Sequence, residues 1–305
     1  MKIWAVILGL LFSQMSHAVL PLSVTEVAAG VYLHLSPHHW PDRENHGEIA
    51  NIGFIVGDKC VAVIDSGGSP QQGLALRNAV TQITHKPVCY VINTHVHPDH
   101  IYGNIAFKDI AGVQFVGHHK LARAMASRAP HYLGRAEEVL AIAVNADNII
   151  PPDIAVKDSI TLNLGNRELL LTAHPTAHTD NDLSVYDKKT ATLWLADLLF
   201  QEHIPVIDGS IKGWLTEMQR LEQHRYPLVI PGHGGVVKNW PLAMQPQKQY
   251  LTAMANDIRA YIKQGKTLEQ AVANIGLNAK QHWQLFEEFH RKNITLAFAE
   301  LEWED

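Results

Sequence analysis

The sequence predicts an α/β fold in which helices cover layers of β-sheet. Short apolar runs separated by turn residues recur along most of the chain, as they do in strands. Two of these runs flank a segment with helical spacing, and residues 240–301 carry further helical patterns. The 305 residues would suffice for one large domain or two small ones. Because we find neither a low-complexity linker nor a clear repeat, we expect one domain with a helical C-terminal segment.

The first half of the chain predicts a hairpin followed by a crossover. Residues 24–35 alternate in a β fashion, and the apolar runs 49–56 and 60–64 are separated by a short Gly-Asp-Lys turn typical of a hairpin. Residues 71–84 have helical spacing and lead into the compact apolar strand 88–92. The strand 60–64, the helix and the strand 88–92 therefore form a β-α-β unit, which requires the two strands to be parallel.

The second half of the chain shows a less regular pattern of strands and helices. We expect a strand at 113–116, a helix at 119–127 that Pro130 terminates, and another helical stretch from His131 to about Ala143. Further strands are expected at 154–156, 168–172, 183–187, 192–195 and 228–230, with a helix at 210–224. The tail 240–301 should hold three helical segments, interrupted near Gly265 and Gly276.

Composition is that of a globular protein and gives no sign of a nucleic-acid partner. Hydrophobic residues make up 47% of the chain and charged residues 18%, with a formal net charge of −5. The 19 histidines stand against only 2 cysteines. Such an excess points weakly to metal chemistry and depends on where the histidines fall.

The first 18 residues predict a cleaved signal peptide. Lys2 precedes an apolar run at 3–12, and the small residues Ser16 and Ala18 lie two apart behind it, as a signal peptidase needs. A run of ten residues is too short to span a bilayer, which takes about 20. We expect cleavage after Ala18, a mature chain of residues 19–305 without a membrane segment, and a periplasmic or secreted location.

Four metal-ligand side chains occur within one short loop. The loop 94–100, which follows the predicted strand 88–92, reads THVHPDH. Loops at the carboxyl ends of strands are where α/β folds place their sites. In an extended loop His95 and His97 point the same way and can share one ion, which leaves Asp99 and His100 for a second. Because buried histidine and aspartate are costly without partners, this density favours a metal site over a polar turn.

Three further candidate ligands lie where later strands end. His178 follows the predicted strand 168–172, Asp197 follows the apolar run 193–196, and His233 follows the predicted strand 228–230. Taken singly, each would be read as an ordinary polar loop residue. Together with the loop 94–100 they supply the distant ligands that a zinc site requires.

In this order and spacing, the four segments resemble the metallo-β-lactamase superfamily. The resemblance runs from Val24 to about His233 and implies an αββα sandwich with the metals at one edge. It implies two zinc ions per chain: His95, His97 and His178 would bind the first, Asp99, His100 and His233 the second, and Asp197 would bridge them. In having an aspartate at position 197, the chain resembles the glyoxalase II branch of the superfamily. Many β-lactamases of the superfamily have cysteine or serine at that point.

More narrowly, residues 49–54 (IANIGF), 65–68 (DSGG) and 208–214 (DGSIKGW) resemble the quinoprotein relay system zinc metallohydrolases. Members of that family are exported and associated with periplasmic quinoprotein dehydrogenases. The resemblance therefore implies a partner of this kind besides a small-molecule substrate.

The expected activity is zinc-dependent hydrolysis. A hydroxide that bridges two zinc ions would attack the carbonyl of a small ester, thioester or amide, and Asp99 is the candidate catalytic residue that orients it. Three other functions stay open: β-lactam hydrolysis, oxygen chemistry by an iron-dependent relative, and metal binding without catalysis in a periplasmic maturation protein. The complete ligand set argues against the last of these.

Some residues are candidates for the substrate pocket. The loop 36–48 should border the site and carries Trp40, which could cover an apolar substrate. His119 and His203 are further candidates, although a structural or solvated role is the alternative for both. The same alternative holds for His118, His131 and His174, which the seven-ligand set does not need.

Four other side chains each carry two interpretations. Asp65 and Asp182 would either orient ligand imidazoles or cap turns at strand ends. Cys60 and Cys89 each lie five residues before a predicted strand end. If these strands are neighbours in an oxidising compartment the two can form a disulfide, and otherwise they are small buried thiols.

Overall fold

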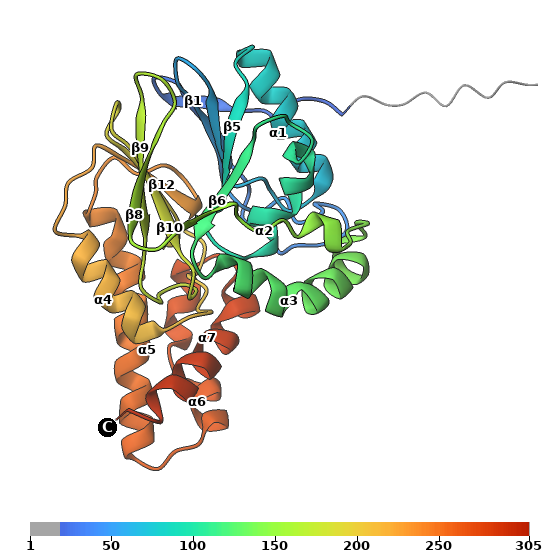
Figure 1. Ribbon diagram of the computed structural model, residues 1–305. Coiled ribbons are helices and arrows are strands. Elements are labelled where there is room, and N and C mark those ends of the chain that lie inside the picture. Colours follow the sequence, from blue (N-terminus) through green and yellow to red (C-terminus); the bar gives the residue numbers. More distant parts are fainter. Residues whose placement is uncertain (1–18, 305) are drawn as a thin grey trace, which may run out of the picture.

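A computed structural model describes residues 19–304, so the expected signal peptide at 1–18 lies outside the described residues. Two β-sheets pack face to face, and helices lie on both outer faces (Figure 1). This is the αββα arrangement that the resemblance implied. Within the described residues, no helix has the length and apolar character needed to cross a membrane.

The first sheet has seven strands in chain order. They are β1 (Thr25–Ala28), β2 (Val31–His34), β3 (Ile52–Val56), β4 (Val61–Ile64), β5 (Val88–Ile92), β6 (Gln114–His118) and β7 (Ile154–Val156). Pairing is antiparallel from β1 to β4 and parallel from β4 to β7. The predicted hairpin of β3 with β4 and the parallel crossover from β4 to β5 are therefore confirmed.

The second sheet has five strands in the order β12-β11-β10-β9-β8. They are β8 (Ser159–Asn163), β9 (Glu168–Ala173), β10 (Leu183–Asp187), β11 (Thr192–Phe200) and β12 (Leu228–His233). Strands β8 to β11 pair antiparallel, whereas β11 and β12 are parallel.

Helices cover both sheets. On the first sheet lie α1 (Pro70–Ile83), the short α2 (Pro98–Ile101) and, beside them, α3 (Leu121–Arg135). The Ser69 side chain caps α1 by accepting a hydrogen bond from the backbone N–H of Gln72. The second sheet is covered by α4 (Ile211–Leu221), α5 (Gln245–Lys263) and α7 (Phe286–Leu301), with α6 (Leu268–Asn274) packed against α7. The three predicted helical segments of the tail are thus confirmed, and in Figure 1 they extend below the sheets.

The buried strands explain why the sandwich has three apolar layers. Successive residues of a strand point to opposite faces, so Val61 and Val63 of β4 pack under α1 while Ala62 and Ile64 face the second sheet. A strand covered on both faces reads as a continuous apolar run, which is what β4 shows.

The prediction that Pro130 ends a helix was wrong, because Pro130 lies inside helix α3. The helix continues through Pro130 to Arg135, and a π-helical turn follows at Ala136–Leu140. Proline removes the hydrogen bond to the Ala126 carbonyl, but both residues are exposed and water can replace the donor. Beyond the proline, Tyr132 packs into a buried apolar cluster and its carbonyl accepts a hydrogen bond from the Tyr102 hydroxyl at 2.8 Å.

Two strands of the second sheet also differ from expectation. Strand β8 was not predicted, because its alternating pattern holds only the two apolar residues Ile160 and Leu162. Strand β11 was predicted to end at Leu195 but runs to Phe200. Its register against β12 shifts on either side of Ala196, which has the left-handed backbone angle φ = 48°. Such a kink leaves no trace in hydrophobic periodicity.

The structure settles the two interpretations of the cysteines. Cys60 and Cys89 form a disulfide, with their Cα atoms 5.8 Å apart. Cys60 directly precedes β4 and Cys89 lies in the neighbouring β5, so the bridge links the two strands at the crossover.

Candidate metal centre

The strand ends of both sheets meet at one edge of the sandwich and bring the predicted ligands together. His95 and His97 follow β5 of the first sheet. His178 lies in the loop between β9 and β10, Asp197 lies inside β11, and His233 ends β12, all from the second sheet. Ligands separated by more than a hundred residues therefore share one site.

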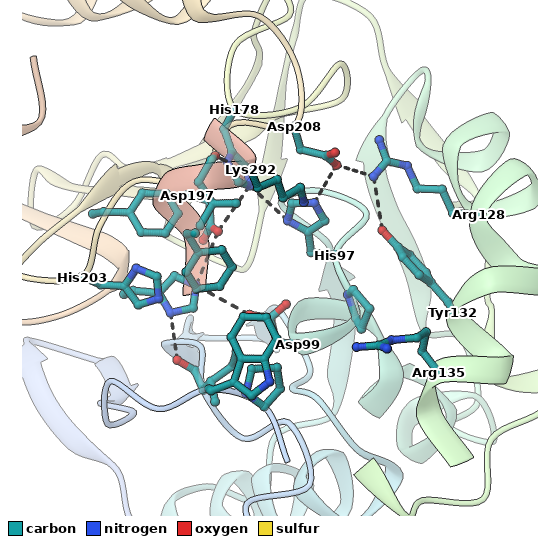
Figure 2. Close-up of a pocket in the computed structure, with 18 of the residues that line it drawn as sticks. His97, Asp99, Arg128, Tyr132, Arg135, His178, Asp197, His203, Asp208 and Lys292 are labelled. Carbon is teal, nitrogen blue, oxygen red and sulfur yellow. Dashed lines mark hydrogen bonds and ion pairs between the residues drawn. The ribbon is translucent and has the colours of Figure 1, made fainter. Parts of the chain in front are cut away.

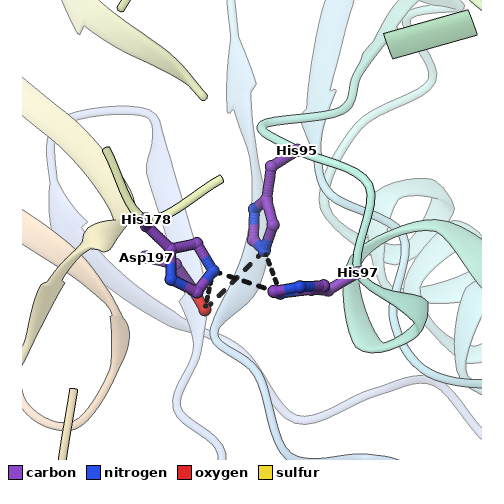
Figure 3. Close-up of side chains that lie close together, drawn as sticks. All are labelled: His95, His97, His178 and Asp197. Atoms are coloured by element: carbon purple, nitrogen blue, oxygen red, sulfur yellow. Dashed lines mark hydrogen bonds and ion pairs between the residues drawn. The ribbon is translucent and has the colours of Figure 1, made fainter. Parts of the chain in front are cut away.

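The first group of ligand atoms comes from three histidines and one aspartate (Figure 3). Nδ1 of His97 lies 3.0 Å from Nε2 of His95 and 3.1 Å from Nε2 of His178. Oδ2 of Asp197 lies 3.3 Å from Nε2 of His178. All four ligand atoms are within 4.8 Å of one another.

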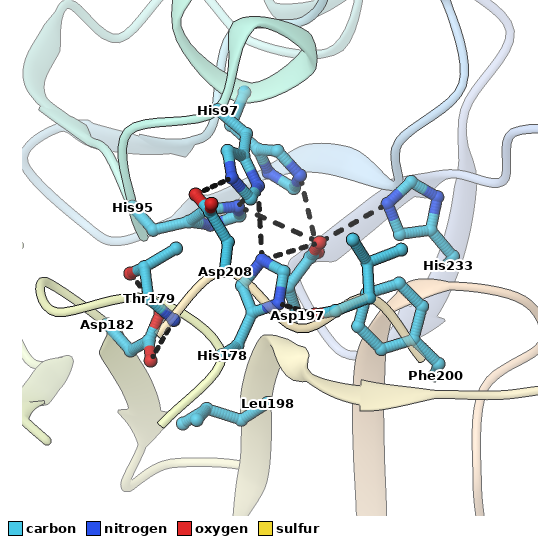
Figure 4. A network of polar contacts seen from close by, with 12 residues as sticks. His95, His97, His178, Thr179, Asp182, Asp197, Leu198, Phe200, Asp208 and His233 are labelled. Carbon is cyan, nitrogen blue, oxygen red and sulfur yellow. Dashed lines mark hydrogen bonds and ion pairs between the residues drawn. The ribbon is translucent and has the colours of Figure 1, made fainter. Parts of the chain in front are cut away.

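The second group comprises Asp99, His100 and His233. Oδ2 of Asp99 lies 3.5 Å from Nε2 of each histidine. Asp197 reaches this group as well, because its Oδ1 lies 3.3 Å from Nε2 of His100 and its Oδ2 lies 3.4 Å from Nε2 of His233. One carboxylate thus contacts both groups, and Figure 4 shows Asp197 between His178 of the first group and His233 of the second.

Backbone carbonyls fix the tautomers of two ligand histidines. Nδ1 of His178 lies 2.6 Å from the Val206 carbonyl, and Nδ1 of His233 lies 2.9 Å from the Ile49 carbonyl. A carbonyl can only accept, so each Nδ1 carries the proton. The lone pair of each Nε2 therefore points into the centre, as metal binding requires.

Carboxylates orient two more imidazoles. Nδ1 of His100 lies 2.8 Å from Asp65, which also accepts the backbone N–H of Thr94, and Nε2 of His97 lies 2.8 Å from Asp208. Of the two interpretations of Asp65, the structure supports the one in which it orients a ligand. Asp182 instead accepts hydrogen bonds from the amide and hydroxyl of Thr179, so it caps a turn.

Burial and charge keep His95, His178 and Asp197 in their metal-binding forms. For His100 and His233, burial alone would lower the pKa, but the carboxylates of Asp99 and Asp197 raise it. Burial lowers the pKa of His178 to about 3 and that of His95 well below its usual value, so both imidazoles are neutral. For Asp197, burial alone would raise the pKa, but the surrounding histidines, His233 foremost, hold it well below its usual range. Neutral imidazole and ionised carboxylate are the forms that bind metal.

Five buried side-chain polar atoms have no hydrogen-bond partner among the described residues, and two of them, Nε2 of His100 and Oδ1 of Asp197, lie in this centre. Leaving buried polar atoms unpaired is costly, and these two face each other across the centre. A cation supplies the missing partner for both. Nitrogen and carboxylate donors of this kind suit zinc, so the residues present fit the expected metal.

Backbone geometry explains how Asp197 reaches the centre. Ala196 adopts φ = 48°, which turns the chain just before Asp197. On the neighbouring strand, a Cβ atom at Gly232 would collide with Oδ1 of Asp197. Glycine at position 232 therefore leaves the space that this carboxylate occupies.

A cavity of about 400 Å³ opens above the ligands (Figure 2). Trp40 and His203 line it, as expected, and the loop 36–48 borders it. Trp40 also contacts Phe289 of α7, with ring centroids 5.2 Å apart. His119 does not line this cavity. Its ring stacks on His118 at 4.3 Å, just before α3.

Other residues that line the cavity were missed from sequence. They are Arg128, Tyr132 and Arg135 of α3, Asp208 in its pocket-lining role, and Phe289 and Lys292 of α7. Arg128 forms an ion pair with Asp208, which in turn contacts His97. Helical spacing marks such residues as exposed positions on helices, and nothing in the sequence places either helix beside the metal loops.

Comparison with known proteins agrees with this geometry. The profile of the metallo-beta-lactamase superfamily matches residues 47–233. The chain belongs to this superfamily. The candidate ligand residues all lie inside the matched segment, whereas the α5–α7 region that carries Lys292 lies outside it.

Solved structures share the superfamily fold at low identity. A metallo-beta-lactamase from Pontibacter korlensis is 22% identical with a TM-score of 0.57, covering 76% of this chain and 99% of its own. The metallo-beta-lactamase FIM-1 from Pseudomonas aeruginosa, solved in a mono-zinc form, is 17% identical with a TM-score of 0.59, covering 77% and 97%. The stereoselective inverting sec-alkylsulfatase Pisa1 from Pseudomonas sp. is 17% identical with a TM-score of 0.65, covering 93% of this chain but 50% of its own.

Proposed function

We propose that this superfamily member is a hydrolase that holds two zinc ions and cleaves the ester, thioester or amide of a small molecule. One observation carries the proposal: Asp197 directs its carboxylate at both groups of ligand atoms. Its Oδ1 lies 3.3 Å from His100 of one group, and its Oδ2 lies 3.3 Å from His178 of the other. A carboxylate has two oxygens and can serve two cations at once, which a neutral imidazole cannot do.

Two cations held here would supply an acidic water, with its pKa lowered from about 15.7 toward 7, and positive charge for a carbonyl oxygen. Residues of the chain would hold the proton of the nucleophile and exclude water. Asp99 lies at the cavity wall with its Oδ2 3.5 Å from His233 and can hold the proton of the nucleophile there. Phe200 and Trp40 line the cavity and exclude water from the substrate.

Metal analysis of the purified mature chain tests the first part of the proposal. We expect two zinc ions per chain and turnover of at least one member of a panel of thioesters, lactones, β-lactams and alkyl sulfates. One iron per chain with oxygen consumption would replace this proposal with an oxygenase. Full zinc loading without turnover of any substrate would favour the non-catalytic binding protein.

We also propose that the protein is exported and acts beside a periplasmic quinoprotein dehydrogenase. The support is the pattern of residues 1–18 and the family-like segment 208–214, whose Asp208 contacts the ligand His97. Mass spectrometry of the exported chain should find Val19 as the first residue. Deleting the gene should lower the activity of such a dehydrogenase at unchanged abundance, and an unaltered activity would contradict the partnership.

A further inference from the structure

The cavity above the ligands continues into a smaller apolar pocket. This side pocket has a volume of about 170 Å³ and shares Ile49, Tyr132 and Arg135 with the main cavity. Val139 and Leu140 from the π-helical turn after α3 line the side pocket but not the main cavity. A dry cavity of about 150 Å³ holds a benzene ring. The side pocket therefore has room for one aromatic ring or a short alkyl chain.

Two cations in the main cavity have no carboxylate partner. Arg135 lies at the end of α3 and Lys292 lies on α7, and both are exposed (Figure 2). Among residues 19–304, neither side chain has a carboxylate oxygen within the 4.0 Å of an ion pair. Arg128 differs from them, because Asp208 neutralises it.

Each acidic residue of the cavity already contacts a histidine or arginine side chain. Asp99 and Asp197 face the ligand histidines, and Asp208 is held between His97 and Arg128. The lining thus presents unpaired positive charge on two helices and no free negative charge. A substrate with an anionic group would be favoured there and a cationic one rejected.

We propose that the substrate is a carboxylate-bearing acyl compound with an aromatic or short alkyl group. The apolar group fills the side pocket, the carbonyl lies over the ligands, and the carboxylate is held by Arg135 and Lys292. This assignment rests on the proposed hydrolase function and names its substrate class. Arg135 lines both pockets, so it lies where the apolar and anionic parts of such a molecule join.

Binding of two matched probes tests the anion site without requiring turnover. Calorimetry on the zinc-loaded mature chain would compare 4-phenylbutyrate with its neutral isostere 4-phenylbutyramide. We expect the acid to bind more tightly, and Arg135→Gln and Lys292→Gln each to weaken it about tenfold while leaving the amide unchanged. The loss should shrink at high salt, because both cations are exposed.

A matched control is Arg123→Gln, since Arg123 is an exposed arginine of α3 that does not line the cavity. It should leave both affinities unchanged. Equal binding of acid and amide to the wild type would overturn the proposal. So would an acid affinity that neither the Arg135 nor the Lys292 variant alters, because the carboxylate would then be held by the metals.

Substitutions that fill the side pocket test whether it binds the apolar group of the substrate. Val139→Phe should weaken both phenyl probes about tenfold and leave acetate binding unchanged, and Val139→Leu should give a smaller loss in the same direction. Unchanged binding of the phenyl probes in both folded variants would contradict this assignment. Since these readouts need no catalysis, a chain that selects the acid but hydrolyses nothing would refute the proposed function alone.

Discussion

At the scale of single residues, the proposed two-metal centre would depend on one carboxylate. Asp197 is buried, contacts histidines of both ligand groups, and leaves its Oδ1 without a hydrogen-bond partner among the described residues. Its negative charge, with that of Asp99 and a hydroxide, would reduce the charge of two divalent ions from +4 to about +1. Two close cations become tolerable only with such compensation.

We therefore expect Asp197→Asn to lose one of two metals. The change keeps the shape but removes the charge, so the affinity for the second metal should fall by at least about 10–100-fold. His95, His97 and His178 would still hold the first ion. Metal analysis after dialysis checks this, with Asp158→Asn as an exposed control. Two retained metals and near-normal activity would show that Asp197 only caps its turn.

Asp65 and Asp208 each orient a ligand of a different group, which predicts opposite selectivity. Asp65→Asn should weaken the metal held by His100, and Asp208→Asn should weaken the metal held by His97, each by about 10–100-fold. Stepwise titration of the metal-free protein with zinc would separate the two sites. The same site weakened in both variants would contradict this division.

At the scale of elements, α3 shows how a helix reaches the site despite its proline. Its residues beyond Pro130 contribute Tyr132 and Arg135 to the cavity, and Arg128 before it holds Asp208. Had the helix ended at Pro130, the apolar cluster under Tyr132 would lose its cover. Packing of that cluster outweighs the hydrogen bond that the proline removes.

The disulfide between the β4 and β5 elements should matter for stability and little for chemistry. It closes a loop of 29 residues through α1, for which chain entropy predicts about 3–4 kcal/mol. Cys60→Ala with Cys89→Ala should lower the free energy of unfolding by about that amount in urea and keep the metal content. Wild-type protein should respond to reductant and the double variant should not, and an unresponsive wild type would argue against the bridge in solution.

At the scale of the whole molecule, the ligands tie the two sheets together. His95, His97, Asp99 and His100 follow a strand of the first sheet, whereas His178, Asp197 and His233 belong to the second. Bound metal would thus link the two halves of the sandwich at one edge. Without it, the neutral imidazoles of His95 and His178 and the ionised carboxylate of Asp197 remain buried together there.

Removal of metal should therefore destabilise the molecule across both sheets. Free zinc at about a hundred times its dissociation constant would add roughly 2.7 kcal/mol per site to the free energy of unfolding. Chelation should lower the melting temperature and speed hydrogen exchange in the 94–100 and 174–182 loops together. Asp197→Asn should show a smaller gain from zinc, and equal gains in both proteins would contradict the two-metal centre.

Much of the site was readable from the sequence, because its ligands fall in dense, spaced motifs at strand ends. The loop 94–100 and the isolated His178, Asp197 and His233 were all predicted, and the structure brings them within reach of one another. The strands around them were also readable, since buried strands are continuous apolar runs with clear turn residues. Local pattern suffices where chemistry and periodicity both lie within a few residues.

Tertiary structure alone decided the rest. The kink at Ala196, the space at Gly232, the unbroken α3 and the cations Arg135 and Lys292 depend on contacts between segments far apart in the chain. A single sequence records which residues a helix exposes but not which cavity they face. The physical reason is that the identity of a ligand depends on the residue type, which the sequence gives directly. The shape and charge of the pocket depend on how distant elements pack against one another.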